Sequence, residues 1–391
     1  MIKKALSGFN VIDFTESIAG AHCTMMLADL GAKVIKVESL AGDGSLRKRF
    51  FKVKDVDPVF TAYNRNKKSI SLNFESEDAK KIVQKLLANA EVAIVDSGSG
   101  KANSLGLNYE EIKEAFPRLI YTVITPFGES GPYCGRLMFE GTIQAESGMS
   151  QSLLNDSGKA PYLVGGRPAE ISCAMVTNIA IQGALHQLTL TGQGQKIVSN
   201  MYTACTLMFN FSIMDYLFNH VEKPVDGNAP NCFLKTKTGW IRVSCGDGPI
   251  WNRTIELIGD PFLNEDRFQD PAVRLEHQSA IIDHVQRWVE QYTSQEVMDL
   301  FTEKGIPCGK VRTVEELKDN EHLLDRKQVV DINVDGIGPL PYFANPCKLN
   351  NSPITYKQAP RLGENTKEIL SELLHFSDAE ISAMENCGSI G

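Results

Sequence analysis

The sequence predicts an α/β protein with a large, doubly wound parallel-sheet domain and a smaller α+β domain. In the first 125 residues, apolar strand-like segments alternate with helical patterns. This alternation favours parallel strands joined by crossover helices. From about residue 225 the pattern changes to a hairpin signal followed by three amphipathic helical patterns. A chain of 391 residues also suits two or three domains of about 100–200 residues each.

The large domain is expected to begin with five strands and two clear helices. The strands are predicted at residues 10–14, 34–38, 69–74, 92–95 and 119–124. The first helix is predicted at residues 21–30, where Gly31 provides the stop signal. The second is predicted at residues 77–88, because apolar side chains recur there at helical spacing.

The middle of the chain combines a loop-rich segment with two apolar helices. Residues 126–170 are rich in Gly, Pro and Ser, so we expect loops, which often carry function when a rigid sheet holds them. Residues 173–190 are almost entirely apolar or small, which predicts a buried helix with one narrow polar stripe. This helix should end at the TGQGQ sequence of residues 191–195, and residues 201–219 predict a second apolar helix.

The smaller domain and the C-terminal segment complete the expected organisation. Strand-like residues 233–237 and 240–244 flank Thr238-Gly239, which is a hairpin signal. Helices are predicted near 250–259, 277–292 and 295–304, and in the C-terminal segment at 366–374 and 378–386. We therefore expect a large domain over 1–224, a small α+β domain over 225–330, and a return to the large domain over 331–391.

Composition excludes several classes of protein. A net charge of −8 argues against nucleic acid as the main partner. No apolar stretch of about 18 residues is present, and the N-terminus lacks an apolar h-region, so we expect neither a membrane span nor a signal peptide. The nine cysteines lack zinc spacing, which indicates thiols in a reducing cytoplasm and no metal site.

Common phosphate-binding and hydrolase motifs are also absent. The turn over residues 15–21 holds one glycine rather than GxGxxG, although a helix start there favours anions. No GxSxG or GxxxxGK[ST] motif occurs. Basic residues gather at Arg47-Lys48-Arg49 and at Arg65, Lys67 and Lys68, close to predicted strands. They indicate either a solvated face or a polyphosphate site at the strand ends.

One carboxylate stands out in the loop-rich segment. Glu170 follows Gly165-Gly166-Arg167-Pro168-Ala169 and precedes the apolar helix. A carboxylate at a helix start is often a cap. The same position suits a nucleophile, because solvation is low and backbone N–H groups are close.

Five motifs in the same order give a family resemblance over residues 8–375. They are GFNVIDFTESIAG…MLADLGAKVIKVE, NRNKKSISLNF, TGQGQ, GIPCGKV and APRLGENTKEIL. Together they resemble the class III CoA-transferases of the formyl-CoA and carnitine CoA-transferase (CaiB/BaiF-like) type. The resemblance implies a Rossmann-like large domain, a small domain, and two chains interlocked as a dimer.

The resemblance also implies covalent chemistry. In that family an aspartate attacks an acyl-CoA thioester, giving a mixed anhydride and CoA thiolate. The thiolate returns to form an enzyme thioester, and an acceptor carboxylate then takes over the acyl position and leaves as a new CoA ester. Coenzyme A is a substrate, and neither a metal nor a redox cofactor is needed.

The resemblance also implies which residues of this sequence occupy the family's site positions. The family aspartate precedes the TG of TGxGQ by about 21 residues, which places Glu170, one methylene longer, at the nucleophile position. Ser39 and Ser104 stand where the family usually has arginine, and Asp96 where it has Asn or Arg; Arg47 and Lys101 are expected to substitute. The implied CoA-binding residues are Ile18, Ala19, Ser39, Arg47, Leu72, Asn73, Phe74, Glu75, Asp96, Ser97, Lys101, Ser104, Leu137, Met138, Phe139 and Glu140.

Three functional interpretations remain at this point. The first is an active CoA-transferase that uses Glu170, binds an acyl-CoA and a carboxylic acid, and forms a homodimer. The second is a non-catalytic subunit that pairs with a homologue carrying the aspartate. The third is an α-methylacyl-CoA racemase, which needs a histidine near position 139, where Phe139 cannot move a proton.

Overall fold

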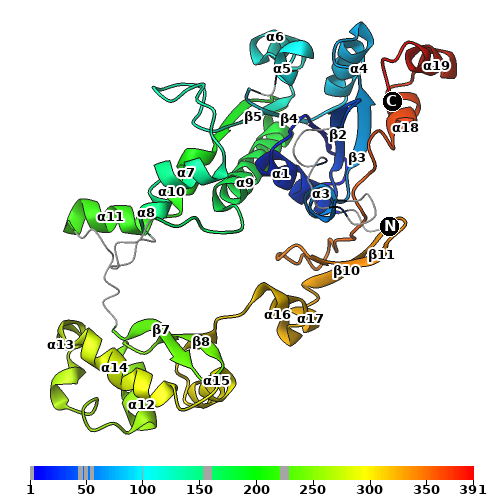
Figure 1. Cartoon of the computed structure of the whole chain (residues 1–391). Coiled ribbons are helices and arrows are strands. Elements are labelled where there is room, and N and C mark those ends of the chain that lie inside the picture. The colour runs from blue at the N-terminus through cyan, green and yellow to red at the C-terminus, as the bar shows by residue number, and fades with distance from the viewer. Residues whose placement is uncertain are drawn as a thin grey trace. The chain divides into compact units, whose positions relative to one another are not determined.

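The computed structural model describes residues 4–42, 47, 52, 57–98, 100–152, 161–220 and 229–391. The chain divides into two compact units (Figure 1). One comprises Met1–Phe211 and Asp325–Gly391, and the other comprises Ser212–Leu324. No helix among the described residues is long and apolar enough to cross a membrane.

The first unit is built on a six-stranded parallel sheet. Its strands are β1 (Asn10–Asp13), β2 (Lys33–Ser39), β3 (Lys68–Leu72), β4 (Val92–Asp96), β5 (Ile120–Thr125) and β6 (Lys196–Asn200). They lie in the order β3-β2-β1-β4-β5-β6, and every neighbouring pair is parallel. The order reverses between β1 and β4, so the predicted doubly wound sheet is confirmed. Strand β6 lies outside the five predicted strands.

Each face of the sheet has its own apolar core, because strand residues alternate between the two faces. Ile12 and Phe14 pack on one face with α4 (Glu77–Ala88) and α6 (Tyr109–Ala115). Val11 packs on the other with α1 (Ile18–Asp29), α9 (Pro168–Thr191) and α10 (Met201–Leu207). Burial on both faces explains why the strands read as continuous apolar runs.

Side-chain caps set the starts of the first long helices. Ser17 accepts a hydrogen bond from the Gly20 amide at the start of α1, and Ser76 accepts one from the Ala79 amide at the start of α4. Each cap satisfies an amide that has no partner within its helix. Helix α3 (Pro58–Asn64) lies between α1 and α4 in the sequence and precedes β3.

The loop-rich segment and the apolar helices differ in part from expectation. Residues 126–170 include two short helices, α7 (Glu140–Glu146) and α8 (Met149–Ser152). The helix predicted at 201–219 is two helices, α10 and α11 (Asn210–Asn219). The prediction of a buried α9 is wrong within a single chain, because Ile179 is 69% exposed and Leu190 is 72% exposed. One side of α9 packs on the sheet and α1, and its other side is not covered by the described chain.

The second unit confirms the predicted α+β character of the smaller part of the chain. Strands β7 (Asn231–Thr236), β8 (Gly239–Ser244) and β9 (Cys308–Lys310) form an antiparallel sheet. The helical elements are α12 (Gly248–Ile258), η1 (Asp266–Gln269), α13 (Pro271–Glu276), α14 (Gln278–Val289), α15 (Ser294–Glu303) and α16 (Val314–Lys318). Fully buried Trp251 lies in an apolar core to which β7, β8, α12, α14 and α15 contribute.

The C-terminal segment adds a hairpin that was not predicted from the sequence. Helix α17 (Glu321–Asp325) leads to β10 (Val329–Val334) and β11 (Gly338–Phe343), which pair antiparallel. After α18 (Thr366–Glu368), the π-helix η2 (Ile369–Leu373) and α19 (Asp378–Asn386), the chain ends beside β3. There Ile390 bridges Leu72, and the Asn73 amide donates to the Ser389 carbonyl at 2.9 Å. The C-terminus thus covers this edge of the sheet.

Candidate functional site

The carboxyl ends of β1 and β4 meet where the strand order reverses, a usual place for ligands in such sheets. Asp96, the last residue of β4, accepts hydrogen bonds there from the backbone amides of Glu16 at 2.6 Å and Ser17 at 2.8 Å. The Ser17 hydroxyl donates to its second oxygen at 2.7 Å. Burial raises the pKa of Asp96, and these donors oppose the rise. A carboxylate of the chain itself therefore occupies the turn that leads into α1.

The two predicted CoA-binding residues on α1 are buried. Ile18 is 4% exposed and packs with Phe60, whereas Ala19 is fully buried in the core under the sheet. Gly20 approaches Thr15 so closely that an added Cβ would lie 2.3 Å from the Thr15 side chain. Contacts from Ile18 and Ala19 to a ligand would therefore come from the backbone.

Lys101, a predicted phosphate-binding residue, is paired with a carboxylate. It is 4% exposed, and its Nζ lies 3.1 Å from Oε1 of Glu16 and 5.4 Å from the centre of the Phe74 ring. It begins α5 (Lys101–Ser104), which ends at the second predicted residue, Ser104. Ser97, between β4 and α5, is exposed. The structure thus brings Lys101 to the carboxyl end of β4, with its charge balanced by Glu16.

Arg47 is held by a bidentate ion pair. Its Nε and Nη2 lie 2.5 and 2.8 Å from the two carboxylate oxygens of Glu38, and Nη2 also donates to the Pro360 carbonyl at 3.0 Å. The guanidinium carbon lies 3.8 Å from the centre of the Phe60 ring. Ser39 follows Glu38 at the end of β2, and its hydroxyl donates to the Gly42 carbonyl at 3.2 Å. Lys48 and Arg49 lie outside the described residues.

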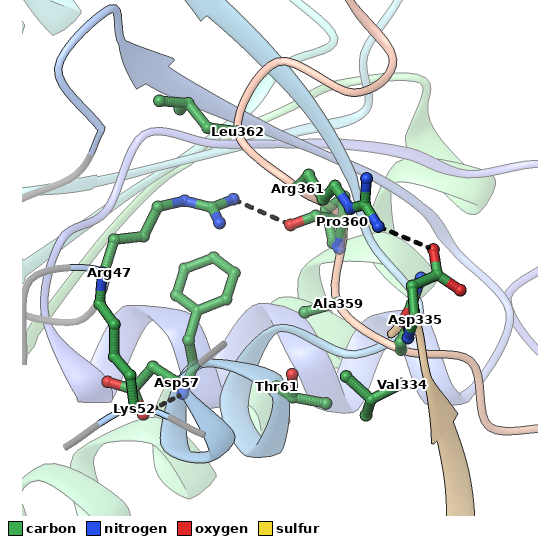
Figure 2. A pocket seen from close by; sticks show the side chains of 12 residues that line it. Arg47, Lys52, Asp57, Thr61, Val334, Asp335, Ala359, Pro360, Arg361 and Leu362 are labelled. Carbon is green, nitrogen blue, oxygen red and sulfur yellow. Dashed lines mark hydrogen bonds and ion pairs between the residues drawn. The ribbon is translucent and has the colours of Figure 1, made fainter. Parts of the chain in front are cut away.

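Arg47 also lines a cavity of about 260 Å³ in the first unit. Figure 2 shows Arg47 and Arg361 around this space, with Arg361 directed toward Asp335 at 3.6 Å. Arg361 is largely exposed, whereas Arg47 is largely buried by its partners. The cavity thus has one fixed and one accessible guanidinium on its wall.

In the second basic cluster, Arg65 and Lys67 are buried and stabilise the fold, whereas Lys68 is partly exposed and pairs with Glu368. Lys67 donates to Asp13 at 2.9 Å, to Asn64 at 2.7 Å and to the Ala21 carbonyl at 3.0 Å. Burial lowers the pKa of Lys67 to about 8. Arg65 forms a bidentate pair with Asp29. Buried carboxylates, which the local pattern did not reveal, neutralise these cations.

Asp13 is the centre of this buried cluster. Besides Lys67, it accepts hydrogen bonds from the hydroxyls of Thr15 at 2.6 Å and Thr24 at 2.7 Å, and Lys36 lies 4.0 Å away. Burial alone would raise the pKa of Asp13, but Lys36 and Lys67 hold it well below its ordinary value. This network fixes the turn between β1 and α1.

The predicted nucleophile, Glu170, lies in the first turn of α9. It is 7% exposed, and one carboxylate oxygen accepts a hydrogen bond from Nε of Arg167, the residue before the helix. Burial raises the pKa of the Glu170 carboxyl, and the Arg167 guanidinium opposes that rise. No role was predicted for Arg167, although its three-residue spacing from Glu170 is a usable signal of contact.

Glu140 holds the start of α9. Its two carboxylate oxygens accept from the amides of Ala169 at 3.0 Å and Glu170 at 2.9 Å, and Gln144 also donates to it at 2.8 Å. The amide of Gln144 pairs in turn with the backbone N–H and carbonyl of Val164. Glu140 is therefore buried and engaged within the chain at 8% exposure.

The remaining predicted residues differ in their accessibility. Leu137 is 83% exposed and Phe139 is 78% exposed, whereas Met138 packs against the core. On β3 and the following turn, Leu72 is fully buried, Asn73 and Phe74 are half-buried, and Glu75 is exposed. Within the described ranges, no group of three His, Cys, Asp or Glu side chains could hold a metal ion.

Comparison with known proteins gives concordant matches over nearly the whole chain. The sequence model of CoA-transferase family III matches residues 6–366. A formyl-CoA:oxalate CoA-transferase of Streptomyces coelicolor is 30% identical over 420 residues, covering 100% of both chains. One from Rhodopseudomonas palustris is 28% identical, covering 99% of this chain and 97% of its own. A crystal structure of a CaiB/BaiF family protein from Brucella suis is similar with a TM-score of 0.83 and 27% identity, covering 95% of this chain and all of the other.

Proposed function

This chain belongs to CoA-transferase family III, and on that premise we propose that it transfers coenzyme A from an acyl-CoA to a carboxylic acid through a covalent intermediate at Glu170. The family and the named relatives support CoA transfer as the general activity, with coenzyme A as part of the substrate. The observation that carries the proposal is a nearly buried carboxylate at the start of α9, with an arginine on one of its oxygens.

The proposed reaction has four steps, each of which balances. A Glu170 oxygen attacks the thioester carbon, the C–S bond breaks, and a mixed anhydride and CoA thiolate result. The thiolate attacks the Glu170 carbonyl, which releases the first acid and leaves a Glu170 thioester. The acceptor carboxylate attacks that carbonyl, giving a new anhydride and thiolate. The thiolate then attacks the acceptor's carbonyl, so that the new acyl-CoA departs and the Glu170 carboxylate is restored.

Arg167 favours the charged form of Glu170 that this reaction needs. A nucleophilic carboxylate must be ionised, and burial by itself favours the neutral acid. The guanidinium of Arg167 donates to one Glu170 oxygen and stabilises the charged form. The other Glu170 oxygen is the one that we assign to attack.

The proposed coenzyme A site lies at the carboxyl ends of β1 to β4. Exposed Ser97 and Glu75 are accessible there, and Leu137 and Phe139 are accessible beside α7. We assign backbone contacts to Ala19 and Leu72, because their side chains are fully buried. Ile18, Ser39, Asn73, Phe74, Ser104, Met138 and Glu140 complete the proposed set, with Arg47 and Lys101 as the cations.

A second candidate function is a subunit that supports a catalytic homologue. The observation that favours it is that the side chains expected near the CoA phosphates already have partners within the chain. Asp96 accepts the amides of the turn before α1, Glu38 forms an ion pair with Arg47, and Glu16 forms one with Lys101. The exposed apolar side of α9 supports assembly with a second chain. We propose that this chain is an identical copy for the active transferase and the catalytic homologue for the supporting subunit.

Intact-protein mass spectrometry after incubation with a panel of acyl-CoAs tests the proposal. A hydroxylamine-sensitive adduct on the peptide containing Glu170 is expected in the wild type and should be absent in Glu170→Gln. Exposed Glu146 on α7 provides a matched control, because Glu146→Gln should load normally.

Glu170→Asp should form the adduct far more slowly than wild type, because the shorter side chain places its carboxylate farther from Arg167. An adduct that persists in Glu170→Gln would contradict the assignment. Absence of both an adduct and CoA binding in the wild type would favour the supporting subunit, and a light-scattering mass would report whether two copies assemble.

A further inference from the structure

One cavity of the first unit has on its wall a buried carboxylate that the described chain only half satisfies. It is the space of about 260 Å³ in Figure 2, and the carboxylate belongs to Asp57. We propose that this cavity binds a small linear zwitterion of the ω-amino acid class, with its ammonium group on Asp57 and its carboxylate on Arg361. Among the described residues that line the cavity, neither Glu170 nor Arg167 occurs, so this ligand is additional to the proposed transfer.

The first argument is the free oxygen of Asp57. The residue is 6% exposed, and its Oδ1 accepts hydrogen bonds from the amides of Val59 at 2.8 Å and Phe60 at 3.4 Å. Its Oδ2 is fully buried and has no hydrogen-bond partner in the described part of the chain. Burying a carboxylate oxygen without a donor is unfavourable, and a cation that binds beside it removes that cost.

Other buried carboxylates of the same unit are fully engaged. Asp13, Asp29 and Glu38 each receive a donor on both oxygens, and in every case one of the donors is a lysine or an arginine. Within the described ranges, Asp57 is the one carboxylate with a fully buried oxygen that lacks a donor. This exception coincides with a cavity, which indicates that a ligand supplies the donor.

The second argument is a cation elsewhere on the same wall. Nη2 of Arg361 lies 3.6 Å from Asp335, and the two side chains are 72% and 61% exposed. An exposed pair of this kind contributes little in water, so the guanidinium can turn to the carboxylate of a ligand. Arg47 is different, because Glu38 and the Pro360 carbonyl hold its guanidinium in place.

The third argument is the arrangement of the wall between these two groups. In Figure 2, Asp57 and Arg361 lie on different sides of the cavity, which favours a ligand with opposite charges at its two ends. Apolar side chains form part of the wall and suit a methylene chain; they belong to Phe60, Val334, Ala359 and Leu362.

Charge balance favours a zwitterion over a simple amine or a simple acid. The cations of the wall are Arg47, Lys52 and Arg361, and the carboxylates on the wall or paired with it are Glu38, Asp57 and Asp335. A ligand without net charge preserves this balance, whereas an amine or an acid would leave one charge uncompensated. At about 260 Å³ the cavity is smaller than the roughly 300–1,000 Å³ of pockets for drug-sized ligands, so the zwitterion must be small.

Calorimetry with four six-carbon compounds tests this assignment. They are 6-aminohexanoate, hexanoate, hexylamine and norleucine. Wild type should bind 6-aminohexanoate at least about 10-fold more tightly than hexanoate or hexylamine, because each of these lacks one charge-assisted contact. Norleucine has the same atoms as 6-aminohexanoate but carries both charges at one end, so its affinity should also be lower.

Two variants assign the contacts to residues. Asp57→Asn keeps an oxygen for the Val59 amide and removes the charge, since asparagine and aspartate cap helices about equally well. It should bind 6-aminohexanoate about 10- to 100-fold more weakly while its melting temperature without ligand matches or exceeds that of wild type. Arg361→Gln should lose a similar factor and keep the hexylamine affinity. Exposed Asp283 and Arg287 on α14 supply the controls Asp283→Asn and Arg287→Gln.

The proposed CoA transfer is tested separately by this design. Glu170→Gln should bind 6-aminohexanoate as wild type does, so a failure of transfer would leave this site standing. No binding of 6-aminohexanoate by wild type, or equal affinities for 6-aminohexanoate and norleucine, would overturn the inference. A clear loss of stability in Asp57→Asn with the ligand affinity unchanged would also overturn it, because Asp57 would then act only as a helix cap.

Discussion

Replacing Glu140 by glutamine should destabilise the start of α9 and thereby the proposed nucleophile. The Glu140 carboxylate accepts from the amides of Ala169 at 3.0 Å and Glu170 at 2.9 Å, and from Gln144 at 2.8 Å. A glutamine side chain has one carbonyl oxygen, so its NH₂ group would face one of the two backbone N–H groups. A buried donor would then have no acceptor, and the negative charge at the helix start would be lost.

The magnitude follows from those contacts. A hydrogen bond to a charged group contributes about 1.5–3 kcal/mol, and an unsatisfied buried donor costs about 1–3 kcal/mol. Because these terms overlap, we expect Glu140→Gln to lower the free energy of unfolding by about 2–4 kcal/mol. At roughly 2 °C per kcal/mol for a unit of this size, the melting temperature should fall by about 4–8 °C.

Differential scanning calorimetry of Glu140→Gln against wild type measures this shift. Glu146→Gln on the same helix is the control, because an exposed substitution should change the unfolding free energy by less than about 0.5 kcal/mol. Glu170 loading should also slow, since a displacement of about 1 Å at a reacting group can cost roughly 100-fold in rate. A melting temperature that matches wild type would refute the structural role derived for Glu140.

Three further outcomes are expected. Asp96→Asn should tighten CoA binding several-fold by calorimetry, because it removes a negative charge before α1 while an oxygen can still accept from the Glu16 and Ser17 amides; unchanged affinity would place the phosphates elsewhere. Asp13 has a folded pKa below its unfolded value, so its contribution to stability is present above about pH 4 and is lost as the pH falls. The stability advantage of wild type over Asp13→Asn in denaturant titrations should therefore shrink from pH 7 to pH 3, and a constant difference would count against the ion pairs. Gly194→Ala should lower stability by more than about 2 kcal/mol, because its Cβ would lie 2.2 Å from the Leu119 carbonyl oxygen, whereas Gly248→Ala, with no atom within 4 Å, should be nearly neutral.

Local sequence patterns were enough to predict most of the sheet. The runs at Val11–Ile12 and Val92–Val95 are apolar on both faces, and the intervening helical patterns require crossovers, so parallel pairing follows from the sequence. Strand β6 escaped prediction because Lys196–Asn200 is short, polar at both ends and only half-buried over most of its length. The β10–β11 hairpin contains two prolines, which weaken a strand signal.

The sequence by itself therefore determined the fold class, the order of most elements, and a carboxylate at position 170 before an apolar helix. Only the tertiary structure decided which charges are neutralised. Arg47 meets Glu38 and the distant Pro360, Lys67 meets Asp13, and Glu140 holds the start of α9. The physical reason is that periodicity reports a residue's immediate neighbours, whereas ion pairs join side chains that the packed sheet and helices bring together from remote parts of the chain.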